Sequence, residues 1–269
     1  MRSSEASTSR RRPMRSWPRP SSIGWSAISV GLAAQGAGDY AAARAAYDES
    51  LALARELDYK RMIARALTQL GEVARLEGNL TEARSLFERT IPMWRENRHG
   101  TGLVDSLRGL GDVARLEGGF AAAQLLLEES LSVCREIGAR PGIAAALQSL
   151  ADLAGARRDV EGAKGHYREA LTLWGEMEHP DGIARCTQGL AKAEVVEGRL
   201  DLAAVLLGES EALRDQIGAI VPPVERPHYD RVMATTRDTL GETVFLEKWN
   251  EGQKLGRRAA ALGVGRLLG

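Results

Sequence analysis

The sequence has few of the residues that build metal and catalytic centres. It contains two cysteines and four histidines among 269 residues, and no two histidines have the spacing that would bring both to one metal ion on a helix. Neither the G-x-x-x-x-G-K-[ST] pattern of phosphate-binding loops nor the G-x-S-x-G pattern of hydrolase nucleophiles occurs. We therefore predict a protein that is not an enzyme, with no catalytic residue, no metal and no cofactor.

Net charge and long apolar runs are also lacking. Lysine plus arginine and aspartate plus glutamate number 36 each, so the chain as a whole has no basic field that would attract nucleic acid. No run reaches the roughly 18 apolar residues of a membrane-spanning helix. We expect a cytoplasmic protein that does not enter a membrane, in which Cys134 and Cys186 are buried free thiols.

Residues 1–22 depart from this charge balance, because they contain six arginines and one acidic residue, Glu5. Pro18, Pro20 and Ser21 interrupt the apolar stretch that an export signal needs after its arginines. We therefore predict a disordered leader rich in arginine, serine and proline. A nucleic-acid- or membrane-binding arm is the alternative for this segment, and DNA binding through it is the weakest functional hypothesis.

A motif that returns at a fixed interval dominates the rest of the sequence. Leu70 begins the stretch LGEVARLEGNLTEARSLF, and Leu110, forty residues later, begins LGDVARLEGGFAAAQLLL. Five copies share this phase, each with an apolar residue, a turn residue and an alanine. The apolar residues are Val30, Leu70, Leu110, Leu150 and Leu190; the turn residues are Gly38, Gly78, Gly118, Arg158 and Gly198; the alanines are Ala43, Ala83, Ala123, Ala163 and Ala203. A period between 20 and 50 residues is the signature of a repeat array.

Each copy is predicted to form two helices. In the second copy, the residues Ile63, Leu67, Leu70 and Ala74 recur with helical spacing and form one apolar stripe. A second helix is expected over about residues 80–96. One pair cannot bury its own apolar face, so successive pairs must stack. We predict an all-α fold, a right-handed superhelical solenoid of five helix pairs with a forty-residue period and a C-terminal helical cap.

Five residues of the second copy stand at diagnostic positions: Leu70, Gly71, Gly78, Ala83 and Phe87. In this pattern the chain resembles the tetratricopeptide repeat (TPR) family, whose usual unit is 34 residues. Because the unit here is forty residues long, we expect longer helices or connections. The resemblance implies that the first helix of each pair lines a concave groove, and that a protein or peptide partner binds there.

The repeat pattern ends where Pro222 and Pro223 break the array. A solenoid needs a cap because its last apolar face has no neighbouring repeat. We therefore assign residues 23–219 to the five repeats, residues 220–253 to capping helices and residues 254–269 to a tail.

The end of the array carries a second set of matches. They are Ala212, Leu213, Arg214, Ile217, Gly218, Pro222, Pro223, Glu225, Arg226, Tyr229, Leu240, Gly241, Phe245, Trp249 and Gly252. In these residues the chain resembles the C-terminal sensor arrays of bacterial LuxR-type and AfsR/SARP-type transcriptional regulators and of STAND ATPases. The resemblance implies a sensor module that works with an ATPase or a DNA-binding domain in the intact system. The alternative is a stand-alone scaffold that joins other proteins without sensing.

The first helices place twelve polar residues on the expected concave face. They are Arg65, Glu72, Arg75, Asp105, Arg108, Asp112, Arg115, Gln148, Asp152, Arg185, Gln188 and Lys192. The planar fork of arginine suits carboxylates and extended peptides, so we predict that this set contacts the partner. The alternative is that Glu72 with Arg75, and Asp112 with Arg115, are solvated pairs within one helix, each worth only a few tenths of a kcal/mol.

Trp94 and Trp174 occupy equivalent positions two repeats apart. We interpret both as part of the core between repeats, where large rings bury the most apolar area. An aromatic box for a ligand is the alternative.

Overall fold

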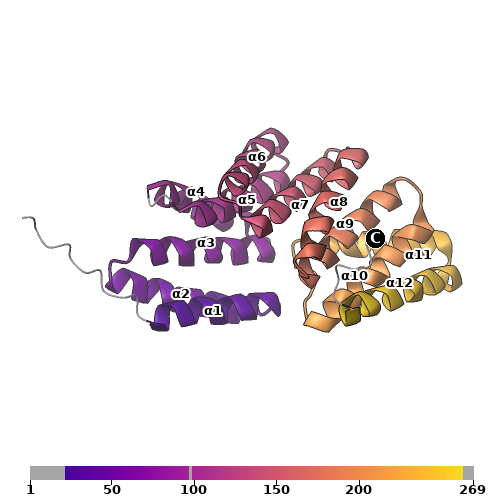
Figure 1. Ribbon diagram of the computed structural model, residues 1–269, viewed down its shortest axis with the longest axis horizontal. Helices are drawn as coiled ribbons and strands as arrows, with labels where there is room; N and C mark the ends of the chain where they lie inside the picture. The colour runs from indigo at the N-terminus through magenta and orange to yellow at the C-terminus, as the bar shows by residue number, and fades with distance from the viewer. Residues whose placement is uncertain (1–21, 97–98, 263–269) are drawn as a thin grey trace, which may run out of the picture.

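Helices make up almost all of the described chain. The computed structural model describes residues 22–96 and 99–262, and within these ranges it contains twelve α-helices and no strand (Figure 1). The helices are α1 (Ser22–Gly36), α2 (Tyr40–Glu56), α3 (Lys60–Glu77), α4 (Leu80–Glu96), α5 (Gly100–Leu116), α6 (Phe120–Glu136), α7 (Arg140–Ala156), α8 (Val160–Glu176), α9 (Pro180–Val196), α10 (Leu200–Ile217), α11 (Arg226–Leu240) and α12 (Glu242–Leu262). The predicted all-α fold is confirmed. The predicted leader lies outside the described residues except for Ser22, which begins α1.

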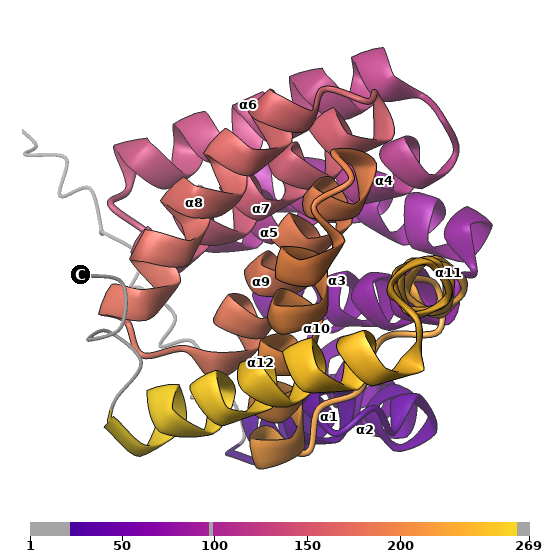
Figure 2. The same ribbon diagram turned by 90° about the vertical axis from the view of Figure 1, so that its right-hand side faces the viewer.

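The first ten helices form five pairs that stack along the chain (Figure 1). Each first helix contacts its own second helix, and the first helices also contact one another from α1 through α9. The first helices therefore line the inside of the curved array, while α4, α6 and α8 lie on its outer rim (Figure 2). This arrangement is the TPR-like solenoid that the sequence predicts.

Residues in the left-handed backbone conformation separate the helices of the array. The first helices are followed by Gly38, Gly78, Gly118, Arg158 and Gly198, and second helices by Asp58, Gly138, Glu178 and Gly218, all at positive φ. These positions recur every twenty residues, so the two halves of a unit are equal in length. The unit is long because its helices are long: α4 through α9 have 17 residues each. Arg158, with φ of 64°, adopts the conformation that glycine adopts more easily in the other copies.

Small residues let aromatic rings pack directly against neighbouring helices. The five recurring alanines are at most 2% exposed. Phe87 of the second pair lies against Gly109 of the third, and Tyr167 of the fourth lies against Gly189 of the fifth. A Cβ atom at either glycine would collide with the ring. These close contacts therefore set the spacing between pairs, because a close-packed interior has no free volume for additional atoms.

Trp94 and Trp174 belong to the core between repeats. Trp94 is 1% exposed, and its Nε1 donates a hydrogen bond to Thr68 Oγ1 at 3.0 Å. Each tryptophan ring lies beside a histidine ring, His99 or His179, with ring centroids 5.2 and 4.7 Å apart. The Nδ1 of each histidine accepts a backbone N–H of the following first helix and so caps its N-terminus. These histidines are structural, a role that their spacing in the sequence does not reveal.

The C-terminal cap is longer than predicted. Helix α12 runs to Leu262, so residues 254–262 belong to the cap and not to the tail that we expected there; residues 263–269 lie outside the described residues. Gly208 in α10 and Gly252 in α12 allow the two helices to pack backbone against backbone. This close contact covers the end of the array.

Cys134 and Cys186 are free and buried, as predicted. Burial raises the pKa of the Cys134 thiol to about 11. No helix in the described ranges is both long and apolar enough to span a membrane. Within the same ranges, no group of three or more histidine, cysteine, aspartate or glutamate residues is placed to hold a metal ion.

The buried alanines offer a direct test of the packing. Replacing Ala123, which is fully buried in α6, with leucine should overpack the helix pair and lower the free energy of unfolding by about 1–3 kcal/mol. Ala121→Leu in the same helix is the control, because Ala121 is exposed, and we expect it to change stability by less than about 0.5 kcal/mol. Urea denaturation of the two variants measures this difference. An equal effect of both substitutions would contradict the packing described here.

Candidate functional site

A network of charged side chains crosses the concave face. Arg65 Nη1 on α3 lies 3.2 Å from Asp105 Oδ2 on α5. Within α5, Arg108 Nη1 lies 3.4 Å from Asp112 Oδ2, and Arg115 Nε lies 3.9 Å from Asp112 Oδ1. The structure therefore brings five of the predicted groove residues into two ion-pair clusters on α3 and α5, and Asp112, at 4% exposed, is buried within the second cluster.

The Glu72–Arg75 pair is largely buried, which contradicts both the predicted contact of Arg75 with a partner and the alternative of a solvated pair. Arg75 donates from Nε and Nη2 to both carboxylate oxygens of Glu72, at 2.9 and 2.7 Å. The side chains are 1% and 14% exposed, respectively. Burial would raise the pKa of Glu72, but the charge and hydrogen bonds of Arg75 outweigh it and lower this pKa far below the usual range. Arg75 is therefore a structural residue that a partner cannot reach.

A segment from the far end of the chain lies against the same part of the groove. Residues 218–225, which we call the strap, connect α10 to α11 and run back to the first two repeats. The backbone N–H of Val224 donates to the carbonyl oxygen of Leu76 in α3 at 3.2 Å. Ile220 lies directly against Gly38 at the turn after α1. The solenoid is thus curved enough for its C-terminal end to touch its N-terminal half.

The strap also brings a carboxylate to the centre of the groove. Burial works against the charges of Arg75 and Arg185, yet the pKa of each guanidinium is raised, in part by Glu225. Arg75 belongs to the second repeat and Arg185 to the fifth, and their charges act on each other across the groove. Tyr40 joins this cluster, and its pKa is raised by burial and by Glu225 and Glu72. One part of the concave face is therefore filled and neutralised by the chain itself.

Two other predicted groove residues lie beneath the surface. Gln148 is 6% exposed and accepts a weak hydrogen bond from the thiol of Cys186 at 3.8 Å. Gln188 is 3% exposed and accepts a hydrogen bond from Arg214. Their side chains connect neighbouring helices and are buried, so the prediction that they form part of the partner-binding surface is wrong.

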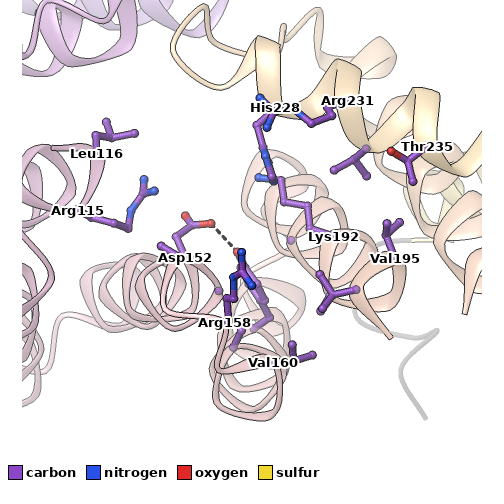
Figure 3. Close-up of a pocket in the computed structure, with 18 residues that line it drawn as sticks. Arg115, Leu116, Asp152, Arg158, Val160, Lys192, Val195, His228, Arg231 and Thr235 are labelled. Carbon is purple, nitrogen blue, oxygen red and sulfur yellow. Dashed lines mark hydrogen bonds between the residues drawn. The ribbon is translucent and has the colours of Figure 1, made fainter. Parts of the chain in front are cut away.

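The open part of the groove contains a cavity of about 690 Å³ between α5, α7, α8, α9 and α11, which we call the distal pocket (Figure 3). Its charged lining residues are Arg115, Asp152, Arg158, Lys192, His228 and Arg231. His228 and Arg231 approach from α11, opposite Arg115 and Asp152 on the repeats (Figure 3). Three of the six were predicted groove residues. The other three were missed, although Arg158 stands where the other copies have glycine, a departure that the sequence shows.

Charges of the distal pocket act on one another. Burial would raise the pKa of Asp152, but Arg115, Lys192 and a hydrogen bond from the Tyr167 hydroxyl lower it. Asp152 is therefore ionised, and its negative charge, together with burial, holds the pKa of Tyr167 well above the usual value. The pKa of His228 is lowered, first by burial and then by Lys192 and Arg231. Four cationic side chains, Arg115, Arg158, Lys192 and Arg231, therefore line the pocket with one carboxylate, Asp152.

Comparison with known families identifies the array. A family model described as "MalT-like TPR region" matches residues 60–226, and a tetratricopeptide repeat model matches residues 22–96. The chain belongs to the MalT-like TPR family. The match of this MalT-like TPR chain extends to Arg226 and so includes the strap. A comparison with curated protein sequences finds no match.

Solved structures resemble the MalT-like TPR chain in fold. BtubC (BKLC) from P. vanneervenii is 19% identical, with 82% of this chain and 91% of that chain covered and a TM-score of 0.56. A Rap protein complexed with competence and sporulation factor is 13% identical, with 93% and 77% covered and a TM-score of 0.64. The apo form of RapI is 13% identical, with 88% and 97% covered and a TM-score of 0.56. At these identities the likeness concerns the fold alone.

The buried ion pair gives a prediction about stability. Arg75→Ala leaves Glu72 buried without its partner, and we expect the free energy of unfolding to fall by about 3–5 kcal/mol. Arg65→Ala is the matched control on the same helix, because the Arg65–Asp105 pair is 27% and 37% exposed; it should cost at most about 1 kcal/mol. Chemical denaturation of both variants measures the difference. Equal losses would contradict the burial of the Glu72–Arg75 pair in solution.

Proposed function

We propose that this chain is a non-catalytic binding module that receives an extended protein or peptide segment on its concave face. The observation that carries the proposal is the distribution of polar groups on this face. Arg65 and Asp105 are accessible on α3 and α5, and the open distal pocket continues the same surface over α7 and α9. A preformed groove with forked donors and carboxylates suits the backbone and side chains of an extended segment.

Two solved relatives in fold support this assignment by analogy. The Rap protein noted above is complexed with competence and sporulation factor. The Rap conjugation gene regulator of the plasmid pLS20, which is 12% identical with a TM-score of 0.55, is in complex with the Phr* peptide. Folds host many functions, so the geometry of this groove, and not the likeness, is the main support.

We further propose that the module is the sensory part of a bacterial transcriptional regulator or STAND-type ATPase acting in the cytoplasm. The support is the resemblance of residues 212–252 to such sensor arrays, together with the MalT-like family match. In this role, partner binding would change how the array docks on an ATPase or DNA-binding domain.

A scaffold without a sensing role is the second candidate. It is favoured by apolar side chains on α1 at the N-terminal edge of the array, where Trp25, Val30 and Leu32 are 36%, 57% and 42% exposed. Exposed apolar patches of this kind mark contact surfaces. In that case, a partner would bind the edge and not the groove.

A pair of double variants distinguishes the groove from other surfaces. Arg65→Ala with Asp105→Ala removes a groove ion pair without leaving either charge alone, so stability should change by at most about 1 kcal/mol. Binding of a partner peptide, identified by affinity capture and then titrated in synthetic form, should weaken about tenfold or more, since hydrogen bonds to charged groups contribute about 1.5–3 kcal/mol.

The control variant removes an equivalent pair on the outer rim. Arg135 on α6 and Glu169 on α8 lie 3.9 Å apart and are 59% and 54% exposed. Arg135→Ala with Glu169→Ala should leave the affinity for the peptide unchanged. If the groove variant binds as well as the wild type, or if the rim variant alone loses binding, the groove is not the binding surface.

A further inference from the structure

The distal pocket has an excess of cations that the rest of the groove lacks. Arg158, Lys192 and Arg231 form no ion pair and no side-chain hydrogen bond with any residue in the described ranges. Elsewhere on the concave face, cations face acids, as Arg65 faces Asp105 at 3.2 Å. The charge of Lys192 acts on Asp152, whereas Arg158 and Arg231 have no acid within ion-pair distance among the residues that the structure describes. Like charges around one cavity repel one another, so the pocket favours an anion.

The one carboxylate in the lining cannot neutralise this charge. Asp152 accepts a hydrogen bond from the Tyr167 hydroxyl, which fixes it against the wall of the pocket. Arg115 also forms an ion pair with Asp112, which lies outside the pocket; Arg115 Nε and Asp112 Oδ1 are 3.9 Å apart. Counting Arg115, four guanidinium and ammonium groups therefore oppose a single carboxylate, and a bound anion would add the missing charge.

The remainder of the lining is mostly apolar. Its apolar members are Leu116, Ala156, Val160, Ala163, Ala193, Val195, Val196 and Val232. They lie on the same repeats and cap helix as the cations, so the cavity has both a charged and an apolar wall. A strongly hydrated inorganic anion would leave the apolar wall without a partner, whereas an apolar group attached to the anion would cover it.

We propose that the distal pocket binds a small organic acid, a carboxylate or sulfonate attached to a ring or a short alkyl chain. Arg231 and Lys192 hold the anion from opposite sides, and the valines of α9 and α11 take the apolar body. The cavity of about 690 Å³ is within the range of about 300–1,000 Å³ typical of small-molecule sites. This site goes beyond the proposed function, because it requires no peptide. A partner peptide that presents the same acid at its C-terminus is the other source of this chemistry.

Such a ligand would also link parts of the fold that are otherwise separate. Helix α11 contacts α9, α10 and α12, and its Arg231 faces Asp152 of α7 and Arg115 of α5 across the cavity (Figure 3). An acid bound between them joins the cap to the middle repeats. Because the ligand binds only the folded arrangement, it raises the free energy of unfolding by RT ln(1 + [L]/Kd), and the melting temperature rises with it.

The test compares an acid with its neutral isostere. Naphthalene-1-acetate and naphthalene-1-acetamide share a ring and differ in charge, and calorimetric titration of the full chain measures both. We expect the acetate to bind at least tenfold more tightly than the amide. Arg231→Gln should weaken the acetate about tenfold, while Arg157→Gln should not, because Arg157 is exposed next to Arg158 but does not line the pocket. Thr235→Trp, at an exposed lining position on α11, should block both ligands by filling the cavity.

Several results would overturn the proposal. Equal affinities for naphthalene-1-acetate and naphthalene-1-acetamide would show that charge does not contribute to binding. Unchanged binding of the acetate by Arg231→Gln or Thr235→Trp would show that it binds outside the distal pocket. A peptide ending in phenylalanine, with and without C-terminal amidation, serves as the competing source. If only the free acid of this peptide displaces naphthalene-1-acetate, and does so at lower concentration than the small acid itself, the pocket belongs to a peptide terminus. The Arg65→Ala, Asp105→Ala variant tests the proposed groove function separately, because neither residue lines this pocket.

Discussion

The close approach of successive helix pairs is the constraint on which the rest of the molecule depends. Rings such as Phe87 and Tyr167 lie directly on glycines of the next pair, and the recurring alanines leave no room between paired helices. Repeats in a solenoid contact only their neighbours, so a small rotation per pair accumulates along the chain. In this chain the accumulated curvature brings residues 218–225 back onto α3. The buried ion pair and the distal pocket both follow from that return.

The strap divides the concave face into two electrostatic regions. At the strap, Glu72, Arg75, Arg185 and Glu225 form a cluster in which the charges of the two carboxylates and the two guanidinium groups act on one another. Beyond it, the distal pocket is open and has four cationic side chains against one carboxylate. At one end of the concave face the strap occupies the groove, whereas at the other end the distal pocket is open to a partner. This asymmetry explains why groove residues that look equivalent in the sequence, such as Arg75 and Arg115, have different environments.

The features that depend on contacts between adjacent repeats could be predicted from the sequence. The forty-residue phase predicted the helix pairs and the buried alanines, and the TPR resemblance implied the concave position of Arg65, Asp105 and Arg108. Neither could place Glu225 close to Arg75, because residues 218–225 belong to no repeat and reach α3 only through the total curvature. The same reason explains why His228 and Arg231 were missed: they line the pocket from α11, outside the periodic region. Gln148 and Gln188 share the register position of Arg108, but their shorter side chains accept hydrogen bonds from Cys186 and Arg214 on neighbouring helices, and the register does not reveal these partners.

The contact between strap and α3 is the central claim, and amide hydrogen exchange at Val224 tests it most directly. Its N–H donates to Leu76, so the structure predicts exchange as slow as that of the helices of the second repeat, well below the rate of an unstructured peptide. The amide of Ile220, which donates to no acceptor in the described parts of the chain, should exchange much faster and serves as the internal reference. If Val224 exchanged as fast as Ile220, the solenoid would be open in solution. The account of the buried ion pair and the distal pocket would then be wrong.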